Sequence, residues 1–123
     1  MFNYFISGHI KPEINPFHFG GTLRSGQRIS VTCAVTIGNP PFIFVWMKDG
    51  DPLEQSDTLS IRNIDEYNSN LAITKLGPEH NGNYTCKVSN KAGSAMQSNV
   101  LLMKGKNVIK WCLTELKAFK IYV

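Results

Sequence analysis

Four residues constrain the fold of this chain more than any other feature of its sequence. Cys33, Trp46, Tyr84 and Cys86 follow one another in that order, and the tyrosine stands two positions before the second cysteine. In a sandwich of two sheets packed about 10 Å apart, one cysteine on each sheet allows a disulfide to cross the core. A tryptophan from the next strand packs against that disulfide, and a tyrosine at this position returns its hydroxyl to the chain as a corner. The order therefore predicts a two-sheet sandwich with a Cys33–Cys86 disulfide.

The cysteine count leaves one residue over. Three cysteines are present, and Cys112 lies far from the other two, near the end of the chain. A pair plus one unpaired cysteine is the simplest interpretation of an odd count. Closing the loop between Cys33 and Cys86 would stabilise the fold by about 4 kcal/mol, a large share of the stability of a small domain. The alternative is two unrelated core cysteines in a reduced protein.

The remaining pattern is that of an all-β protein. Clusters of glycine, proline, asparagine and aspartate recur at spacings typical of a sandwich, at residues 20–21, 25–26, 38–41, 49–52, 77–78 and 81–82. Residues 28–37 alternate apolar and polar side chains, as a half-buried strand does. Further strands are expected at 42–48, 59–64, 70–76, 83–89 and 95–103. We predict a two-sheet Greek-key sandwich with Trp46, Leu71 and Tyr84 in its core.

Both ends of the chain differ in character from its middle. Residues 11–104 are expected to form the domain, residues 1–10 an extension outside it, and residues 105–123 a basic tail outside it. The tail spaces its apolar residues as on one face of a helix, so a basic amphipathic helix on a membrane surface is the other interpretation. The opening residues lack the pattern of an export signal, and no apolar run reaches the ~18 residues of a membrane span.

Charge and residue clusters argue against several classes of function. Basic and acidic side chains balance up to Met103, and the formal charge of +4 comes from the last twenty residues. The body therefore lacks the basic surface that a nucleic-acid-binding protein needs. The three histidines are scattered, and no spacing of cysteine or histidine is typical of a zinc site. We expect no enzymatic activity, no metal and no cofactor.

The motifs together resemble the immunoglobulin superfamily, in particular its I-set type. The residues that carry this resemblance are Gly26, Cys33, Trp46, Lys48, Asp49, Gly50, Leu71, Ile73, Gly82, Tyr84, Cys86, Asn90, Ala92 and Gly93. Within that set the chain is most similar to the Down syndrome cell adhesion molecule family of arthropods, through residues 11–19, 38–41 and 80–86. The resemblance implies cell-surface recognition, often homophilic, by one domain of a long ectodomain.

One position departs from the I-set pattern. His80 stands where these domains usually place an aspartate that pairs with an arginine of strand D. The departure implies that Arg62 is free of that salt bridge and that His80 itself caps the turn.

Strand parity and one sequon indicate which face of the sandwich binds. One of the two sheets holds strands A, B, E and D in the lettering used for immunoglobulin domains. Its outer face is expected to carry small, nearly uncharged side chains, so that it could lie flat against another such face with little desolvation cost. That face comprises Ser30, Thr32, Ala34, Thr36, Thr58, Ser60, Arg62, Asn70, Ala72 and Thr74. The other sheet is expected to present Ile43, Val45, Met47, Asn83, Thr85, Lys87, Leu101 and Met103.

The second face is the more apolar one, which would ordinarily favour it as the contact. Asn83 argues the other way, because Asn83-Tyr84-Thr85 is an N-glycosylation acceptor and a glycan there would shield part of that face. In the family that the chain resembles, self-pairing of a variable domain uses the A-B-E-D side. We therefore expect binding through the A-B-E-D face.

The sequence thus predicts an extracellular adhesion or recognition module. Its expected partner is a protein, the same domain on an opposing chain, and its expected location is the cell surface, as part of a larger membrane protein. One alternative is an intracellular I-set scaffold domain of a muscle-type protein, with reduced cysteines. The other is a heterophilic immune-type receptor or secreted binding domain.

Overall fold

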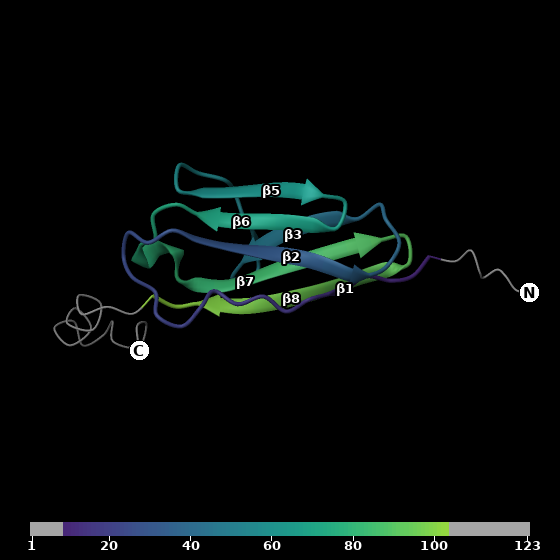
Figure 1. Cartoon of the computed structure of the whole chain (residues 1–123), viewed down its shortest axis with the longest axis horizontal. Coiled ribbons are helices and arrows are strands. Elements are labelled where there is room, and N and C mark those ends of the chain that lie inside the picture. The colour runs from purple at the N-terminus through teal and green to yellow at the C-terminus, as the bar shows by residue number, and fades with distance from the viewer. Residues whose placement is uncertain (1–8, 104–123) are drawn as a thin grey trace, which may run out of the picture.

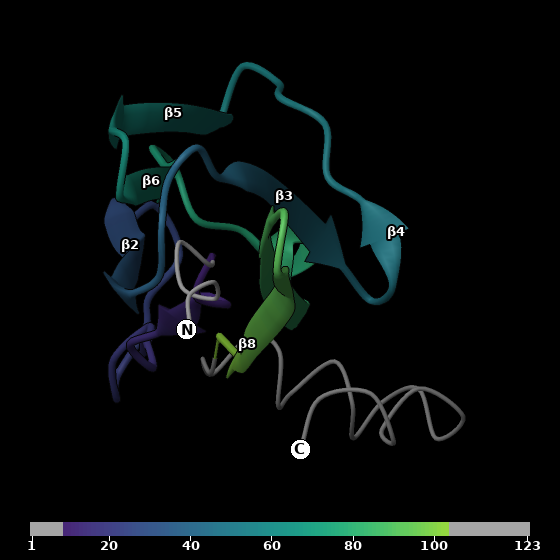
Figure 2. The same ribbon diagram turned by 90° about the vertical axis from the view of Figure 1, so that its right-hand side faces the viewer.

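Eight strands form two four-stranded antiparallel sheets that pack face to face (Figures 1 and 2). The computed structural model describes residues 9–103. The first sheet has the order β1-β2-β6-β5 and the second the order β4-β3-β7-β8. The strands are β1 (Glu13–Ile14), β2 (Ile29–Ile37), β3 (Ile43–Lys48), β4 (Asp51–Pro52), β5 (Leu59–Asp65), β6 (Asn68–Ile73), β7 (Gly82–Asn90) and β8 (Gly93–Leu101). β2 pairs with β6 and β3 with β7, strands that are distant in sequence, so the all-β Greek-key sandwich expected from the sequence is confirmed.

The core lies between the sheets and consists of the side chains that strand alternation directs inward. β2 shows the period clearly, because Ile29, Val31, Cys33 and Val35 are buried while the residues between them are at least partly exposed. Cys33 and Cys86 are joined by a disulfide with a Cα–Cα distance of 6.4 Å. Both sulfur-bearing residues are fully buried, and each comes from a different sheet.

Trp46 makes a second connection between the sheets. Its indole Nε1 donates a hydrogen bond of 3.0 Å to the hydroxyl of Ser69, which is fully buried. In the strand register Trp46 lies opposite Cys86, and Ser69 lies opposite Cys33. The hydrogen bond therefore joins β3 to β6 beside the disulfide, which joins β2 to β7.

An aromatic segment closes one side of the sandwich. After β1 the chain runs along β8 (Figure 1). Phe17 and Phe19 in this segment are buried in the core. The ring of Phe17 lies 5.4 Å from that of Trp46, and the ring of Phe19 lies 5.3 Å from that of Tyr84. The amide of Phe19 also donates to Asn99 Oδ1 on β8. These contacts attach the segment after β1 to core residues of β3 and β7 and to β8.

Two tight turns need glycine. Gly50 follows Asp49 in the hairpin between β3 and β4, and both residues have positive φ, of 88° and 51°. Such a conformation is open to glycine and tolerated by aspartate. At Gly38, with φ of 131°, an added Cβ would stand 2.9 Å from the Cα of Pro12. Glycine there lets the loop after β2 approach the start of the domain.

Candidate binding faces

The outer side of β2, β5 and β6 forms a face that we call the polar face. Its members are Ser30, Thr32, Ala34, Thr36, Ser60, Arg62, Asn70, Ala72 and Thr74. The register aligns them in rows across the three strands, one of which is Ser30, Ala72 and Ser60. Arg62 supplies the only charge among these nine residues, and most of the others are small. The face is consequently flat and weakly charged.

Asn70 organises the centre of the polar face. Its Nδ2 donates to the hydroxyl of Ser30 at 2.8 Å, to the carbonyl of Val31 at 3.1 Å and to the hydroxyl of Thr32 at 3.3 Å. The side chains of Asn70, Ser30 and Thr32 are thus hydrogen-bonded to one another and do not depend on water alone for hydrogen-bond partners. Covering a group that already has a protein partner costs less free energy than covering one that has none.

Two expectations about this face need correction. Ala72 points outward by parity but is only 4% exposed, because its short side chain lies below those of Ser30 and Ser60 on either side. Thr58 lies just before β5, and its hydroxyl contacts His80 Nε2 at 3.2 Å rather than standing free on the face. Ala72 has no polar side-chain group, and the Thr58 hydroxyl is already engaged by His80.

His80 is buried at the corner where the two sheets are joined, in the 3₁₀ turn η1 (Pro78–His80). The amide of Gly77 donates to His80 Nδ1 at 2.9 Å, so this nitrogen is an acceptor. A neutral ring then carries its proton on Nε2 and donates it to Thr58. The histidine caps the turn, as its departure from the I-set pattern implied. Its side-chain hydrogen-bond partner is Thr58 rather than Arg62.

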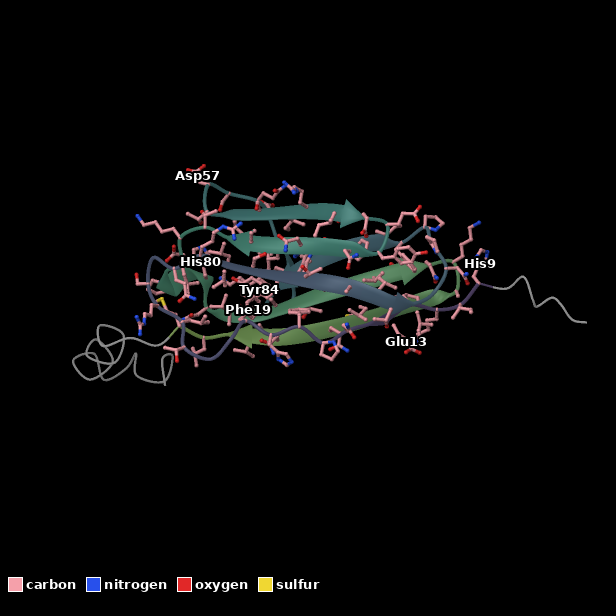
Figure 3. The ribbon with its side chains drawn as sticks, in the orientation of Figure 1. His9, Glu13, Phe19, Asp57, His80 and Tyr84 are labelled. Atoms are coloured by element: carbon pink, nitrogen blue, oxygen red, sulfur yellow. A yellow bond between two sulfur atoms is a disulfide. The ribbon has the colours of Figure 1, made fainter. Side chains whose placement is uncertain are left out.

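Tyr84 completes this corner. Its hydroxyl donates to the carbonyl of His80 at 2.6 Å, and Figure 3 shows its ring in the interior beside Phe19. Burial, followed by the negative charges of Asp49 and Glu79, raises the pKa of Tyr84 from 10.0 to about 12. The phenol is therefore a fixed structural donor at any physiological pH.

The outer side of β3, β7 and β8 forms a second face, which we call the apolar face. Its members are Ile43, Val45, Met47, Asn83, Thr85, Lys87, Met96, Ser98 and Val100. Four of them are exposed large hydrophobic residues: Ile43 is 66% exposed, Val45 39%, Met96 59% and Val100 60%. Scattered exposed apolar residues are ordinary, but here they share one sheet.

The expected placement of Leu101 and Met103 on this face is wrong, because both are buried. The turn between β7 and β8 pairs Asn90 with Gly93, and this register carries Met96, Ser98 and Val100 outward. Leu101 has the opposite parity and enters the core. Met96 and Val100 are the residues that the sequence interpretation missed. Counting strand parity from the turn at Asn90 to Gly93 would have found them.

Asn83 lies at the beginning of β7 and is exposed. Its backbone is held on both sides by the adjoining turn, because its amide donates to Asp49 Oδ1 at 2.9 Å and its carbonyl accepts from the amide of Asp49 at 2.8 Å. Across the strand pair it faces Val100. Two residues on, the hydroxyl of Thr85 lies 2.6 Å from that of Ser98.

Other chemistry has little support in the part of the chain that the structure describes. Within residues 9–103, no group of three or more histidine, cysteine, aspartate or glutamate side chains is placed to hold a metal ion. No helix in that range has both the length and the apolar character needed to cross a membrane. Cys112 and the basic tail at 105–123 lie outside the described residues, as does most of the extension at 1–10.

Sequence comparison identifies the family. The sequence profile of the immunoglobulin I-set domain matches residues 12–102. The chain belongs to the immunoglobulin I-set family. This I-set domain is 37% identical over 95 residues to the cell adhesion molecule Dscam2 of Drosophila melanogaster, and 38% identical over 99 residues to human DSCAM. These matches cover 77% and 80% of the chain but 5% of each relative, so the domain spans about one twentieth of their length.

Solved structures give the same result. The Dscam1 Ig7 domain, isoform 5, superposes with a TM-score of 0.75 and 28% identity, covering 79% of this chain and all of that domain. An immunoglobulin domain in the titin M10–obscurin-like 1 complex superposes with a TM-score of 0.66 and 29% identity, covering 79% of this chain and 96% of that one. Both superpositions extend over most of the I-set domain.

Proposed function

We propose that this I-set domain is an extracellular adhesion module that binds a second copy of itself through its polar face. Its relatives are cell adhesion molecules, which supports recognition of proteins as its general role. The observation that carries the choice of face is the hydrogen-bonded centre formed by Asn70, Ser30 and Thr32. Covering this centre in a contact costs less free energy than covering polar groups that have no protein partner.

The shape of the polar face suits pairing with itself. An isologous contact places the same surface on both partners, so a face with many like charges would repel its copy. With Arg62 as its only charge, the polar face avoids most of that repulsion. Its flat rows of serine, threonine and alanine let two sheets approach closely over the length of β2.

The area of the face predicts a weak single contact. Three strands about 4.8 Å apart and a β2 strand of nine residues at ~3.3 Å each give a face of roughly 15 by 30 Å. Stable specific interfaces bury about 800 Å² on each partner, so this face of about 450 Å² is smaller than such an interface. Adhesion through it would depend on many copies acting together on apposed surfaces.

The test is aggregation of beads that display many copies of the chain. Beads of two colours carry either this chain or the human DSCAM domain that it matches. Homophilic binding predicts that beads carrying this chain cluster with one another and do not mix with beads of the second colour, since the partner of this domain is its own copy. Beads that stay dispersed alone but cluster in the mixture would overturn homophily and support heterophilic recognition.

The apolar face favours that second candidate function. Ile43 borders a shallow depression of about 280 Å³, together with Pro41, Ser89, Asn90 and Lys91. Exposed apolar residues beside such a hollow are typical of a site for a different protein. The substitution Val45→Asp places a charge beside this region and should abolish heterophilic clustering while leaving homophilic clustering intact.

The intracellular scaffold alternative gains support from the titin neighbour and is decided by the redox state of the cysteines. An extracellular domain keeps Cys33 and Cys86 as a disulfide, whereas a cytosolic one keeps them as thiols. Alkylation of the native protein without reductant, followed by mass spectrometry, distinguishes the two. Alkylation of both Cys33 and Cys86 would contradict the extracellular proposal.

A further inference from the structure

The apolar face carries the one N-glycosylation sequon of the sequence, Asn83-Tyr84-Thr85. Its three residues alternate in direction, because Asn83 is exposed, Tyr84 is fully buried and Thr85 is partly exposed. The acceptor asparagine therefore projects from the sandwich while the middle residue is anchored in the core. A group attached to Asn83 would stand outside the fold and disturb no buried contact.

The side chain of Asn83 is also free for modification. Several other asparagines use their amides structurally: Asn70 on the polar face, Asn90 in the β7–β8 turn, which donates to the carbonyl of Ile10 at 2.7 Å, and Asn99 on β8. The Asn83 side chain makes no hydrogen bond to any other residue in the range 9–103, and only its backbone is held, by Asp49. Modifying its Nδ2 would break no hydrogen bond of the described structure.

The surroundings of Asn83 favour a covering group. Its cross-strand partner Val100 is 60% exposed, and an apolar side chain so exposed gains from contact with the less polar side of a sugar ring. Met96 is paired with Lys87, four positions farther along β7, which is about 13 Å at ~3.3 Å per residue. The first sugars would therefore cover Val100 and leave Met96 open.

We propose that Asn83 carries an N-linked glycan whose first sugars lie over Val100 and shield that end of the apolar face. In the transfer, Asn83 Nδ2 forms a bond to C1 of the first N-acetylglucosamine and loses one proton. The bond from C1 to the diphosphate of a lipid-linked oligosaccharide donor breaks, and the lipid diphosphate leaves. This inference rests on the extracellular part of the proposed function. It also deepens that proposal, since a glycan would obstruct one end of the apolar face while the polar face carries no sequon.

The first experiment measures occupancy. The full chain is sent through the secretory pathway of insect cells behind a cleavable signal and then treated with peptide-N-glycosidase. We expect the enzyme to lower the apparent mass and convert Asn83 to aspartate, as read by peptide mass spectrometry. Asn83→Gln and Thr85→Ala should both lose the shift, whereas Thr85→Ser should keep it because the sequon survives. Secreted wild-type chain with an intact disulfide and unmodified Asn83 would overturn the proposal.

The second experiment tests the position of the glycan. Hydroxyl-radical labelling compares the glycosylated chain with its enzymatically deglycosylated form. Val100 should be labelled several-fold less when the glycan is present, and Met96 on the same strand should be labelled equally in both forms. Equal labelling of Val100 would show that the sugars do not cover it.

The failure of this inference is distinguishable from failure of the proposed function. Beads bearing Asn83→Gln should still cluster, because the polar face lies on the other sheet. A secreted wild-type chain that is unglycosylated but clusters overturns the glycan alone, and a glycosylated wild-type chain that stays dispersed overturns homophilic binding alone.

Discussion

The indole nitrogen of Trp46 donates a hydrogen bond to the hydroxyl of Ser69 across the core, 3.0 Å away and beside the disulfide. Tryptophan in a core usually needs a partner for its N–H, because a buried donor without an acceptor is costly. Ser69 meets that need from the opposite sheet. Covalent and hydrogen-bonded connections between the sheets thus coincide at one place in the sandwich.

Removing the Ser69 hydroxyl should destabilise the domain. In Ser69→Ala the Trp46 N–H stays buried without an acceptor, which we expect to lower the free energy of unfolding by about 1–3 kcal/mol. Chemical denaturation measures the loss. The matched control is Ser69→Ala in a Trp46→Phe background, where no indole N–H remains and the cost should be much smaller. Equal costs in the two backgrounds would show that the hydrogen bond contributes nothing.

The raised pKa of Tyr84 predicts a loss of stability in alkali. A tyrosine whose pKa is higher in the folded state keeps its proton longer when folded, so its contribution is complete below pH 10.0 and falls as the pH rises to about 12. The full loss is about 2–3 kcal/mol, since one pKa unit corresponds to about 1.4 kcal/mol. Unfolding free energies measured across this range should fall less steeply in Tyr84→Phe. The same slope in both proteins would contradict the assignment.

The hydrogen bonds of His80 predict that two substitutions lower the free energy of unfolding by different amounts. His80→Phe keeps a ring but leaves the buried amide of Gly77 without its acceptor, so we expect a loss of about 1–3 kcal/mol. Thr58→Val removes only the partner of Nε2 and should cost less, about 0.5–1.5 kcal/mol. For a domain of this size 1 kcal/mol lowers the Tm by roughly 4–8 °C, so thermal unfolding resolves the order. A larger loss in Thr58→Val would refute this account of the corner.

The sequence was sufficient for the fold because its strongest signals are local or ordered along the chain. The alternation in β2 and the succession Cys33, Trp46, Tyr84 and Cys86 require no knowledge of which strands pair. Ser69 was missed because a polar residue at an inward position looks like an interruption until its partner on the other sheet is known. Ser69 stands two positions before Leu71 and therefore points to the same, inward side of β6, which is the signal that could have identified it.

The binding faces were predicted less completely, because they depend on register. The outward positions of β2 and β6 follow from alternation within each strand, and the structure places them on one face. For β8 the strand was expected to start at Ala95, whereas it starts at Gly93 and pairs from the turn. This two-residue difference leaves the parity of the strand unchanged; the error was to direct the odd-numbered residues of β8 outward, so Leu101 was placed outside and Val100 was overlooked. Counting from the turn at Asn90 to Gly93, which sets the pairing with β7, settles that choice.

The central claim is that the domain recognises its own copy through the polar face, and aggregation of beads carrying single variants tests it most directly. Thr32→Asp and Thr74→Asp each place a carboxylate on both partners of an isologous contact, where repulsion and desolvation oppose pairing. Val45→Asp is the matched change on the apolar face. We predict that the two threonine variants cluster far less than wild type while Val45→Asp clusters normally. Normal clustering of both threonine variants together with dispersed Val45→Asp beads would contradict the claim.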